Sequence, residues 1–160
     1  MIKLIELYTD SALLRPLKSL LMEYGNYMFH DLGLIAGKKS FYEQIEADPD
    51  RSYQLPNGTF ILAEVKGKIA GCVGIRRYSD EFCEMKRMYV RPEFRGLGIG
   101  QLMCSYVIER SKDLGYPKIY LDTNAEMRSA VNLYINAGFK SISPYCINEN
   151  PNPIFMEYVL

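Results

Sequence analysis

The sequence predicts a mixed α/β fold, in which one twisted, mostly antiparallel sheet of six to seven strands carries helices on both faces. Two apolar, β-branched runs are joined by Lys66-Gly67-Lys68, which is typical of a hairpin between antiparallel strands. Later in the chain a strand, a helix and a second strand follow one another, and this order predicts a right-handed crossover with one parallel pair. The length of 160 residues suits one domain, so we expect residues 1–160 to form a single unit.

The expected elements follow from hydrophobic periodicity and from residues that begin or end helices. Thr9, Asp10 and Ser11 are helix-capping residues, and apolar residues recur at helical spacing after them, with Pro16 in the first turn. Gly138 closes the last helix. In order along the chain we expect a strand at 2–8, helices at 13–28 and 40–47, strands at 59–65, 69–75 and 83–90, a helix from 99 to near Gly115, a strand at 118–123, a helix at 126–137 and strands at 139–146 and 154–159.

A glycine-rich turn between a strand and a helix, Arg95-Gly96-Leu97-Gly98-Ile99-Gly100, is the most informative feature of the chain. The first N–H groups of a helix have no partner inside the helix and lie at the positive end of its dipole, so they bind anions. Glycines let a phosphate approach these groups closely. A nucleoside-triphosphate loop would need Lys and Ser or Thr where Gln101 and Leu102 stand, and a dinucleotide fingerprint would need glycine in place of Met103.

What remains, Arg95-x-x-Gly98-x-Gly100 after a strand that ends in Val90-Arg91-Pro92, resembles the acyl-CoA loop of the GNAT superfamily of N-acyltransferases. A second motif, Leu133-Tyr134-Ile135-Asn136-Ala137-Gly138-Phe139, is similar to the superfamily's helix that carries Leu-Tyr and closes at Gly-Phe. The resemblance extends over residues 57–160 and points to a small-molecule branch. It implies acetyl-CoA as the co-substrate, held by Met88, Tyr89, Val90, Arg95, Gly96, Leu97, Gly98, Ile99, Gly100, Asn124 and Tyr134.

The resemblance also implies two catalytic roles. The pantetheine arm would lie along residues 88–90 in a gap between splayed strands, which directs the thioester toward Glu84, the candidate general base. A glutamate needs burial or a water relay to deprotonate an ammonium, because its ordinary pKa is about 4.3. The alternative is that Glu84 only forms an ion pair, with Lys86 or Arg87 of the same strand or with a neighbour. Tyr134 is the candidate general acid for the leaving thiolate, since a phenol stays protonated at neutral pH, and its alternative role is that of a core aromatic.

Other residues bear on these assignments. His30 is a rival base because an imidazole titrates near neutral pH, although a lone loop histidine is usually at the surface. Relatives carry asparagine three residues before the helix alanine, where this chain has Met127, so that Asn124 or Arg128 would have to replace this coenzyme contact. Cys83 has no histidine near it in the sequence, which argues against a covalent enzyme intermediate.

Composition narrows the expected partners. The 19 basic and 19 acidic residues balance, so neither nucleic acid nor an anionic membrane is expected to bind. The four cysteines lack close pairing and indicate reduced thiols, and the single histidine leaves no metal constellation, so no metal is expected. The N-terminus indicates a strand rather than a signal peptide, and no apolar run is long enough to span a membrane. We expect a cytoplasmic protein, either a monomer or a homodimer. Basic residues gather before the glycine turn, and they form either a solvated face or part of the phosphate site. They are Arg76, Arg77, Lys86, Arg87, Arg91 and Arg95.

The predicted function is transfer of an acetyl group from acetyl-CoA to a primary amine of a small molecule, by direct attack within a ternary complex. Two alternatives stay open: an acyl-CoA-binding module without turnover, and an enzyme that acetylates protein lysines or N-termini and therefore needs an open acceptor groove. The acceptor is expected to be bound by two weakly patterned segments, about 24–56 and 145–153. Their tyrosines either line an aromatic pocket or belong to the core: Tyr24, Tyr27, Tyr53 and Tyr145.

Overall fold

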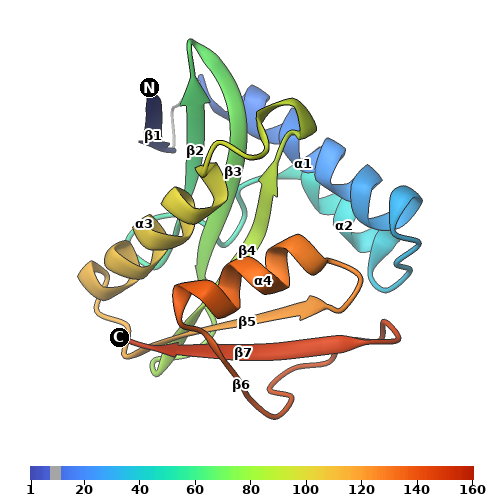
Figure 1. The fold of residues 1–160 in the computed structure, drawn as a ribbon, viewed down its shortest axis with the longest axis vertical. Helices are drawn as coiled ribbons and strands as arrows, with labels where there is room; N and C mark the ends of the chain where they lie inside the picture. The colour runs from blue at the N-terminus through green and yellow to red at the C-terminus, as the bar shows by residue number, and fades with distance from the viewer. Residues whose placement is uncertain (8–11) are drawn as a thin grey trace.

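The computed structural model describes residues 1–7 and 12–160, which form a seven-stranded sheet with helices on both faces (Figure 1). The strands lie in the order β1-β2-β3-β4-β5-β7-β6, and every neighbouring pair is antiparallel except β4 and β5. The predicted mixed sheet with one parallel pair is confirmed. The strands are β1 (Ile2–Glu6), β2 (Thr59–Val65), β3 (Lys68–Arg77), β4 (Phe82–Val90), β5 (Lys118–Asn124), β6 (Lys140–Ser141) and β7 (Pro153–Val159).

The helices divide between the two faces of the sheet because residues alternate along the strands. On β2, Phe60 and Leu62 pack with the apolar side of the N-terminal helix, whereas Ile61 and Ala63 pack with the helix that follows the glycine turn. Helices α1 (Leu14–Asn26) and α2 (Lys38–Ala47), with the π-helical turn η1 (Tyr27–Asp31) after α1, therefore cover one face, and α3 (Ile99–Asp113) and α4 (Arg128–Ala137) cover the other. Among the described residues, none of the helices is long and apolar enough to cross a membrane.

Strands β4 and β5 pair over only part of their length, and this positions the site. Their parallel register joins Phe82–Glu84 to residues 118–120. Beyond this point β4 continues to Val90 and β5 to Asn124, and the two strands no longer pair with each other. Figure 1 shows the two strands diverging, with α3 making the crossover between them. The predicted splay is confirmed, and it leaves the backbone of residues 88–90 without a β5 partner.

Several predicted boundaries differ from the structure. The prediction of a strand at 139–146 is wrong. Only Lys140–Ser141 pair with β7, and the Ile142 N–H donates one further bond to the Phe155 carbonyl. Pro144 has no N–H to donate, which ends the ladder. The first strand ends at Glu6, and the last predicted helix begins at Arg128 rather than at 126. The expected caps Thr9, Asp10 and Ser11 lie outside the described residues, whereas Pro16 is in the first turn of α1 as predicted.

Candidate active site

The glycine turn presents backbone N–H groups at the beginning of α3. Gly98 is the N-cap residue at φ 79°, and Gly96 has φ 81°, so both occupy the left-handed region that favours glycine. A Cβ at either position would meet no atom within 4 Å, which shows that backbone conformation rather than space requires these glycines. No side chain caps the helix. Its first N–H groups are therefore available to an anion.

A groove of about 360 Å³ extends from this turn to the beginning of α4. It includes the part of β4 that has no β5 partner, beside the anion-binding turn, where the Val90 carbonyl accepts from Arg95. The groove is lined by Tyr27, Met88, Tyr89, Val90, Phe94, Arg95, Gly96, Gly98, Ile99, Gly100, Gln101, Met127, Ser129, Ala130 and Leu133.

Most residues predicted to hold the coenzyme lie together in this groove, but three do not. Leu97 is 54% exposed and is not part of the wall, and Asn124 and Tyr134 line a different cavity. Arg128, the other candidate to replace the coenzyme contact missing at Met127, is exposed and lines neither space. Ser129 and Ala130 also line the groove and were not predicted. They lie one helical turn before Leu133 on the same face of α4, and this spacing was the available signal.

Arg95 is the cation beside the groove. Its Nε donates to the Val90 carbonyl at 3.0 Å, and its guanidinium lies 5.3 Å from the ring centroid of Tyr27. Arg91, the other arginine of this loop, is already bound to Glu23 at 2.8 Å and to the Ile69 carbonyl at 2.7 Å. Arg95 has no acidic partner among the described residues, so its charge is available to a phosphate.

A second cavity, which we call the acceptor cavity, has a volume of about 470 Å³ and is walled by the segments that were hardest to interpret from sequence. Asn150 Oδ1 accepts the N–H groups of Ile35 and Ala36, each at 3.1 Å, so a loop near the C-terminus is fastened to the loop before α2. The lining residues are Tyr24, Met28, Phe29, Leu34, Ala36, Gly37, Ser40, Phe41, Gln44, Arg76, Met85, Lys86, Arg87, Met88, Leu121, Asp122, Thr123, Asn124, Met127, Tyr134, Ile147, Asn148, Glu149 and Asn150.

The groove and the acceptor cavity adjoin at two methionines. Among the described residues, only Met88 and Met127 line both spaces. Met127 stands where the resemblance would place asparagine, and its sulfur accepts from the Thr123 hydroxyl at 3.7 Å. A flexible thioether on each side of the junction can adapt its shape to a group that passes from one space to the other.

Tyr134 lines the acceptor cavity from α4. Its side chain is buried, with its ring 6.0 Å from that of Phe139, yet none of the described residues forms a hydrogen bond with its hydroxyl. Burial raises the pKa of Tyr134 above its ordinary value of about 10, and nearby Tyr24 and Cys104 raise this pKa further. The phenol therefore stays protonated and keeps a free donor in the cavity wall.

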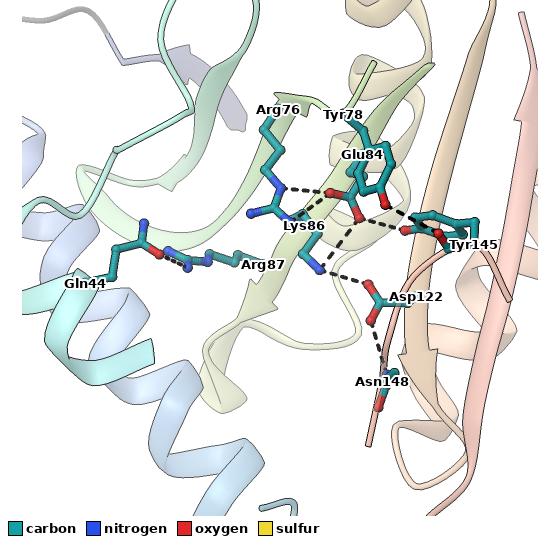
Figure 2. A network of polar contacts seen from close by, with 9 residues as sticks. All are labelled: Gln44, Arg76, Tyr78, Glu84, Lys86, Arg87, Asp122, Tyr145 and Asn148. Atoms are coloured by element: carbon teal, nitrogen blue, oxygen red, sulfur yellow. Dashed lines mark hydrogen bonds and ion pairs between the residues drawn. The ribbon is translucent and has the colours of Figure 1, made fainter. Parts of the chain in front are cut away.

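Glu84 lies behind the acceptor cavity in a network of polar contacts (Figure 2). It is the cross-strand neighbour of Arg76, whose Nε donates to Oε1 at 2.8 Å, while the Tyr145 hydroxyl donates to Oε2 at 2.7 Å. Only 1% of the Glu84 side chain is exposed, and it lines neither space. Its ion-pair partners are Arg76 of the neighbouring strand β3, at 2.8 Å, and Lys86 of its own strand, at 3.9 Å, so the expected ion pairing is present. The assignment of Glu84 as the base stays a prediction.

Asp122, at the cavity wall, was not singled out from the sequence. Its Oδ1 accepts from Lys86 Nζ at 2.8 Å and its Oδ2 accepts from Asn148 Nδ2 at 3.1 Å. Burial opposes the charge on Lys86, but Asp122 and Glu84 outweigh this effect, so the pKa of Lys86 is raised. Oxygens of Asp122 and Glu84 and the sulfur of Cys146 lie within 4.8 Å of one another, and the Lys86 ammonium is the cation beside the two carboxylates.

His30, Cys83 and the four tyrosines named from the sequence differ in whether they line the groove or the acceptor cavity. His30 is exposed in η1 and lines neither space. Cys83 is buried in the core, its thiol donates to Ser111 Oγ at 3.4 Å, and burial raises its pKa to about 11, which does not suit a nucleophile. Of the four tyrosines in question, Tyr24 lines the acceptor cavity and Tyr27 lines the groove. Tyr53 is a core residue stacked on Phe60, and Tyr145 holds Glu84.

The chain is similar to known acetyltransferases over most of its length. A model of the acetyltransferase (GNAT) family matches residues 25–139. An uncharacterized N-acetyltransferase of Schizosaccharomyces pombe is 42% identical over 112 residues, which cover 69% of this chain and 69% of that protein. An uncharacterized N-acetyltransferase of Escherichia coli is 27% identical over 144 residues, which cover 86% of this chain and 80% of that protein.

Solved structures share the fold at lower identity. A GNAT-family acetyltransferase from Staphylococcus aureus aligns with a TM-score of 0.78 and 24% identity over 99% of both chains. An N-acetyltransferase from Thermoplasma acidophilum, solved in complex with coenzyme A, aligns with a TM-score of 0.74 and 16% identity over 100% of this chain and 99% of that one.

Proposed function

Because the chain belongs to the GNAT family of acetyltransferases, we propose that it transfers an acetyl group from acetyl-CoA to the primary amine of a small molecule. The observation that carries this proposal is the contact between two spaces of different character. A groove beside an anion-binding turn adjoins a polar cavity, and among the residues that the structure describes only Met88 and Met127 belong to both. A thioester in the groove and an amine in the cavity would meet between these side chains.

The groove suits the coenzyme. Its diphosphate would accept hydrogen bonds from the N–H groups at the beginning of α3, next to the unpaired charge of Arg95. Its pantetheine arm would pair with the backbone of residues 88–90, which β5 leaves unpaired. The related fold from Thermoplasma acidophilum, which holds coenzyme A, supports this assignment.

The size of the acceptor cavity supports a small-molecule acceptor rather than a protein chain. A volume of about 470 Å³ is typical of small-ligand sites. The Asn150 contacts with residues 35–36 join two loops beside the cavity and give it a defined shape. The volume supports a small amine, and lysine-containing peptides in the assay test the alternative of protein acetylation.

The reaction then needs two proton transfers. The neutral amine attacks the thioester carbon, the new C–N bond forms, the C–S bond breaks, and the sulfur leaves as a thiolate. Tyr134 supplies a proton to that sulfur, because its hydroxyl is protonated and has no hydrogen-bond partner among the described residues. Asp122 and the exposed Glu149 are the carboxylates of the cavity lining. We assign Asp122, in the inner part of the wall, to take the proton that the amine nitrogen loses, whereas the buried Glu84 would take it only through a relay. Direct attack needs no enzyme nucleophile, which agrees with the buried state of Cys83.

A thiol-release assay with acetyl-CoA and a panel of small primary amines tests the proposal. We expect coenzyme A to appear with at least one amine, together with an N-acetylated product identified by mass spectrometry. If acetyl-CoA binds in calorimetry but no amine is acetylated, the chain is a binding module without turnover. If only lysine-containing peptides react, the small-molecule proposal is wrong.

A further inference from the structure

Arg87 is a charged wall residue of the acceptor cavity that no carboxylate among the described residues neutralises. The other two cations of the wall are paired, Arg76 with Glu84 and Lys86 with Asp122, each at 2.8 Å. Arg87 instead donates from Nη2 to the neutral Gln44 amide oxygen at 2.9 Å, and its Nη1 is buried without a partner in the described part of the chain.

An irregularity in β4 brings this side chain to the cavity. In a regular strand successive side chains point to opposite faces, yet the consecutive residues Met85, Lys86, Arg87 and Met88 all line the cavity. The pairing of β3 with β4 shifts register between Cys72 and Gly74, and Arg87 has φ 58°, in the region that favours glycine. An arginine held in this conformation on a cavity wall indicates a use for its side chain there.

The surroundings of Arg87 make its unpaired charge unfavourable. Its guanidinium lies 5.0 Å from the ring centroid of Phe41 and 5.3 Å from that of Tyr53. Aromatic rings attract a cation, but they do not replace the water or the anion that would otherwise solvate it. A ligand anion beside Arg87 would replace a bond to the neutral Gln44 amide by one in which both partners are charged.

The charges of the cavity also limit the kind of anion. With Arg76 and Lys86 neutralised by their partners, Arg87 leaves one positive charge in the buried part of the wall. The other carboxylate of the lining, Glu149, is exposed and forms no ion pair among the described residues. One excess positive charge matches a carboxylate, which carries a single negative charge, better than a phosphate group, which carries nearly two.

From this geometry, and on the basis of the proposed function, we infer that the acceptor is an amino-acid-like molecule whose carboxylate pairs with Arg87 while its amine lies toward Asp122. Figure 2 shows Arg87 extending toward Gln44 of α2 and Lys86 extending the other way, toward Asp122. The two ends of such a molecule would therefore contact opposite parts of the wall.

Matched acceptors test this inference. Glycine, β-alanine and 4-aminobutanoate are compared with their carboxamides, at equal concentrations of the unprotonated amine, in the thiol-release assay. We expect kcat/KM for at least one acid to exceed that of its amide by about 10- to 100-fold. The Arg87→Gln variant should abolish this preference by raising KM for the acid, with little change for the amide. The Arg51→Gln variant, which changes an exposed arginine, is the matched control and should keep the preference.

The outcomes separate this inference from the proposed function. Equal rates for acids and amides in the unchanged protein, or an equal loss for both in Arg87→Gln, would overturn the carboxylate assignment and leave the transferase intact. If no compound is acetylated although acetyl-CoA binds, the proposed function fails. Calorimetry with the same acids in the presence of coenzyme A then decides the inference, since binding must weaken at least tenfold in Arg87→Gln. Preference for an amine that carries a phosphonate instead of a carboxylate would also overturn it.

Discussion

Met88 of β4 and Met127 before α4 line both the groove beside the glycine turn and the acceptor cavity. They come from elements that are 39 residues apart, and they meet because β4 and β5 separate after residues 84 and 120. This junction is the place where the proposed acyl group would lie, so the two side chains should set which acyl groups fit.

Shortening Met127 should therefore relax the acyl-chain preference. In Met127→Ala we expect the ratio of kcat/KM for butyryl-CoA to that for acetyl-CoA to rise by about tenfold, since each methylene that gains a buried place is favourable by about 0.8 kcal/mol. Met28→Ala is the matched control, because Met28 lines the acceptor cavity but not the groove. Rates measured with the two thioesters check this, and an unchanged ratio in Met127→Ala would place the acyl group elsewhere.

The glycine turn offers a test of anion binding that is independent of turnover. Gly98 and Gly115 lie at opposite ends of α3, both have positive φ, 79° and 88°, and a Cβ at either would meet no atom within 4 Å. Replacing either by alanine should lower the free energy of unfolding by a similar amount, about 1 to 2 kcal/mol. Only Gly98→Ala should weaken acetyl-CoA binding, by about tenfold or more in calorimetry. Equal binding by the two variants would contradict the proposed seat of the diphosphate.

The fold could be predicted because its signals are local. The hairpin at Gly67, the helix that begins after the glycine turn and the helix stop at Gly138 each depend on a few neighbouring residues, and all three are in the structure. The groove could be predicted for the same reason, since most of its lining residues lie close together in the sequence, between Met88 and Gln101. The strand expected at 139–146 failed where a proline interrupts the pattern.

The acceptor cavity could not be predicted, because its walls depend on contacts between distant segments. Asn150 joins residues 35–36, which lie more than 110 positions earlier, and nothing in the local pattern of either segment indicates this contact. The position of Arg87 was also hidden. Alternation along a regular strand puts Lys86 and Arg87 on opposite faces, and only the bulge brings both to one cavity.

Tyr134 should act as a proton donor rather than as a core aromatic. Tyr134→Phe keeps the ring and removes the hydroxyl, so we expect kcat to fall by about 100-fold or more while the affinity for acetyl-CoA stays the same. Tyr158→Phe is the control, since the Tyr158 ring also packs on Phe139, at 5.4 Å, but lines neither space. A loss below threefold in Tyr134→Phe would leave this residue with a packing role only.

The pH profile adds a second expectation for Tyr134. Because burial raises the pKa of this phenol above its usual value of about 10, it stays protonated throughout the range in which amines lose their proton. The rate should therefore rise with pH as the neutral amine becomes more abundant and should not decline before about pH 10. A decline with an apparent pKa near 8 or 9 in the unchanged protein, absent from Tyr134→Phe, would contradict the raised pKa.

Buried thiols should make the fold less stable in alkali. Burial raises the pKa of Cys83 and of Cys104 to about 11, whereas a thiol in the unfolded chain titrates near 8.5. Their contribution to stability is complete below about pH 8.5 and is lost as the pH rises toward 11. In this range the thiols of the unfolded chain lose their protons, while the buried thiols of the folded chain keep theirs. Each thiol should lower the free energy of unfolding by about 1.4 kcal/mol per pH unit in that window. Urea unfolding at pH 8, 9 and 10 should show a shallower dependence in Cys104→Ala, and parallel curves would contradict this.

Asp122 and Glu84 both lie beside Lys86, but replacing them should have different effects: the first on the rate and the second on stability. Asp122 lines the cavity, so Asp122→Asn should lower kcat by about 100-fold or more near pH 7 and should recover partly at higher pH, where the amine needs no base. Glu84 is buried and holds Arg76 and Tyr145, so Glu84→Gln should mainly lower the melting temperature, with a loss of kcat below tenfold. Both variants keep the side-chain size, which makes them controls for one another.

The opposite pattern, a rate loss of 100-fold or more in Glu84→Gln with an unchanged melting temperature, would assign the base to Glu84 through a water relay and leave Asp122 to position the amine.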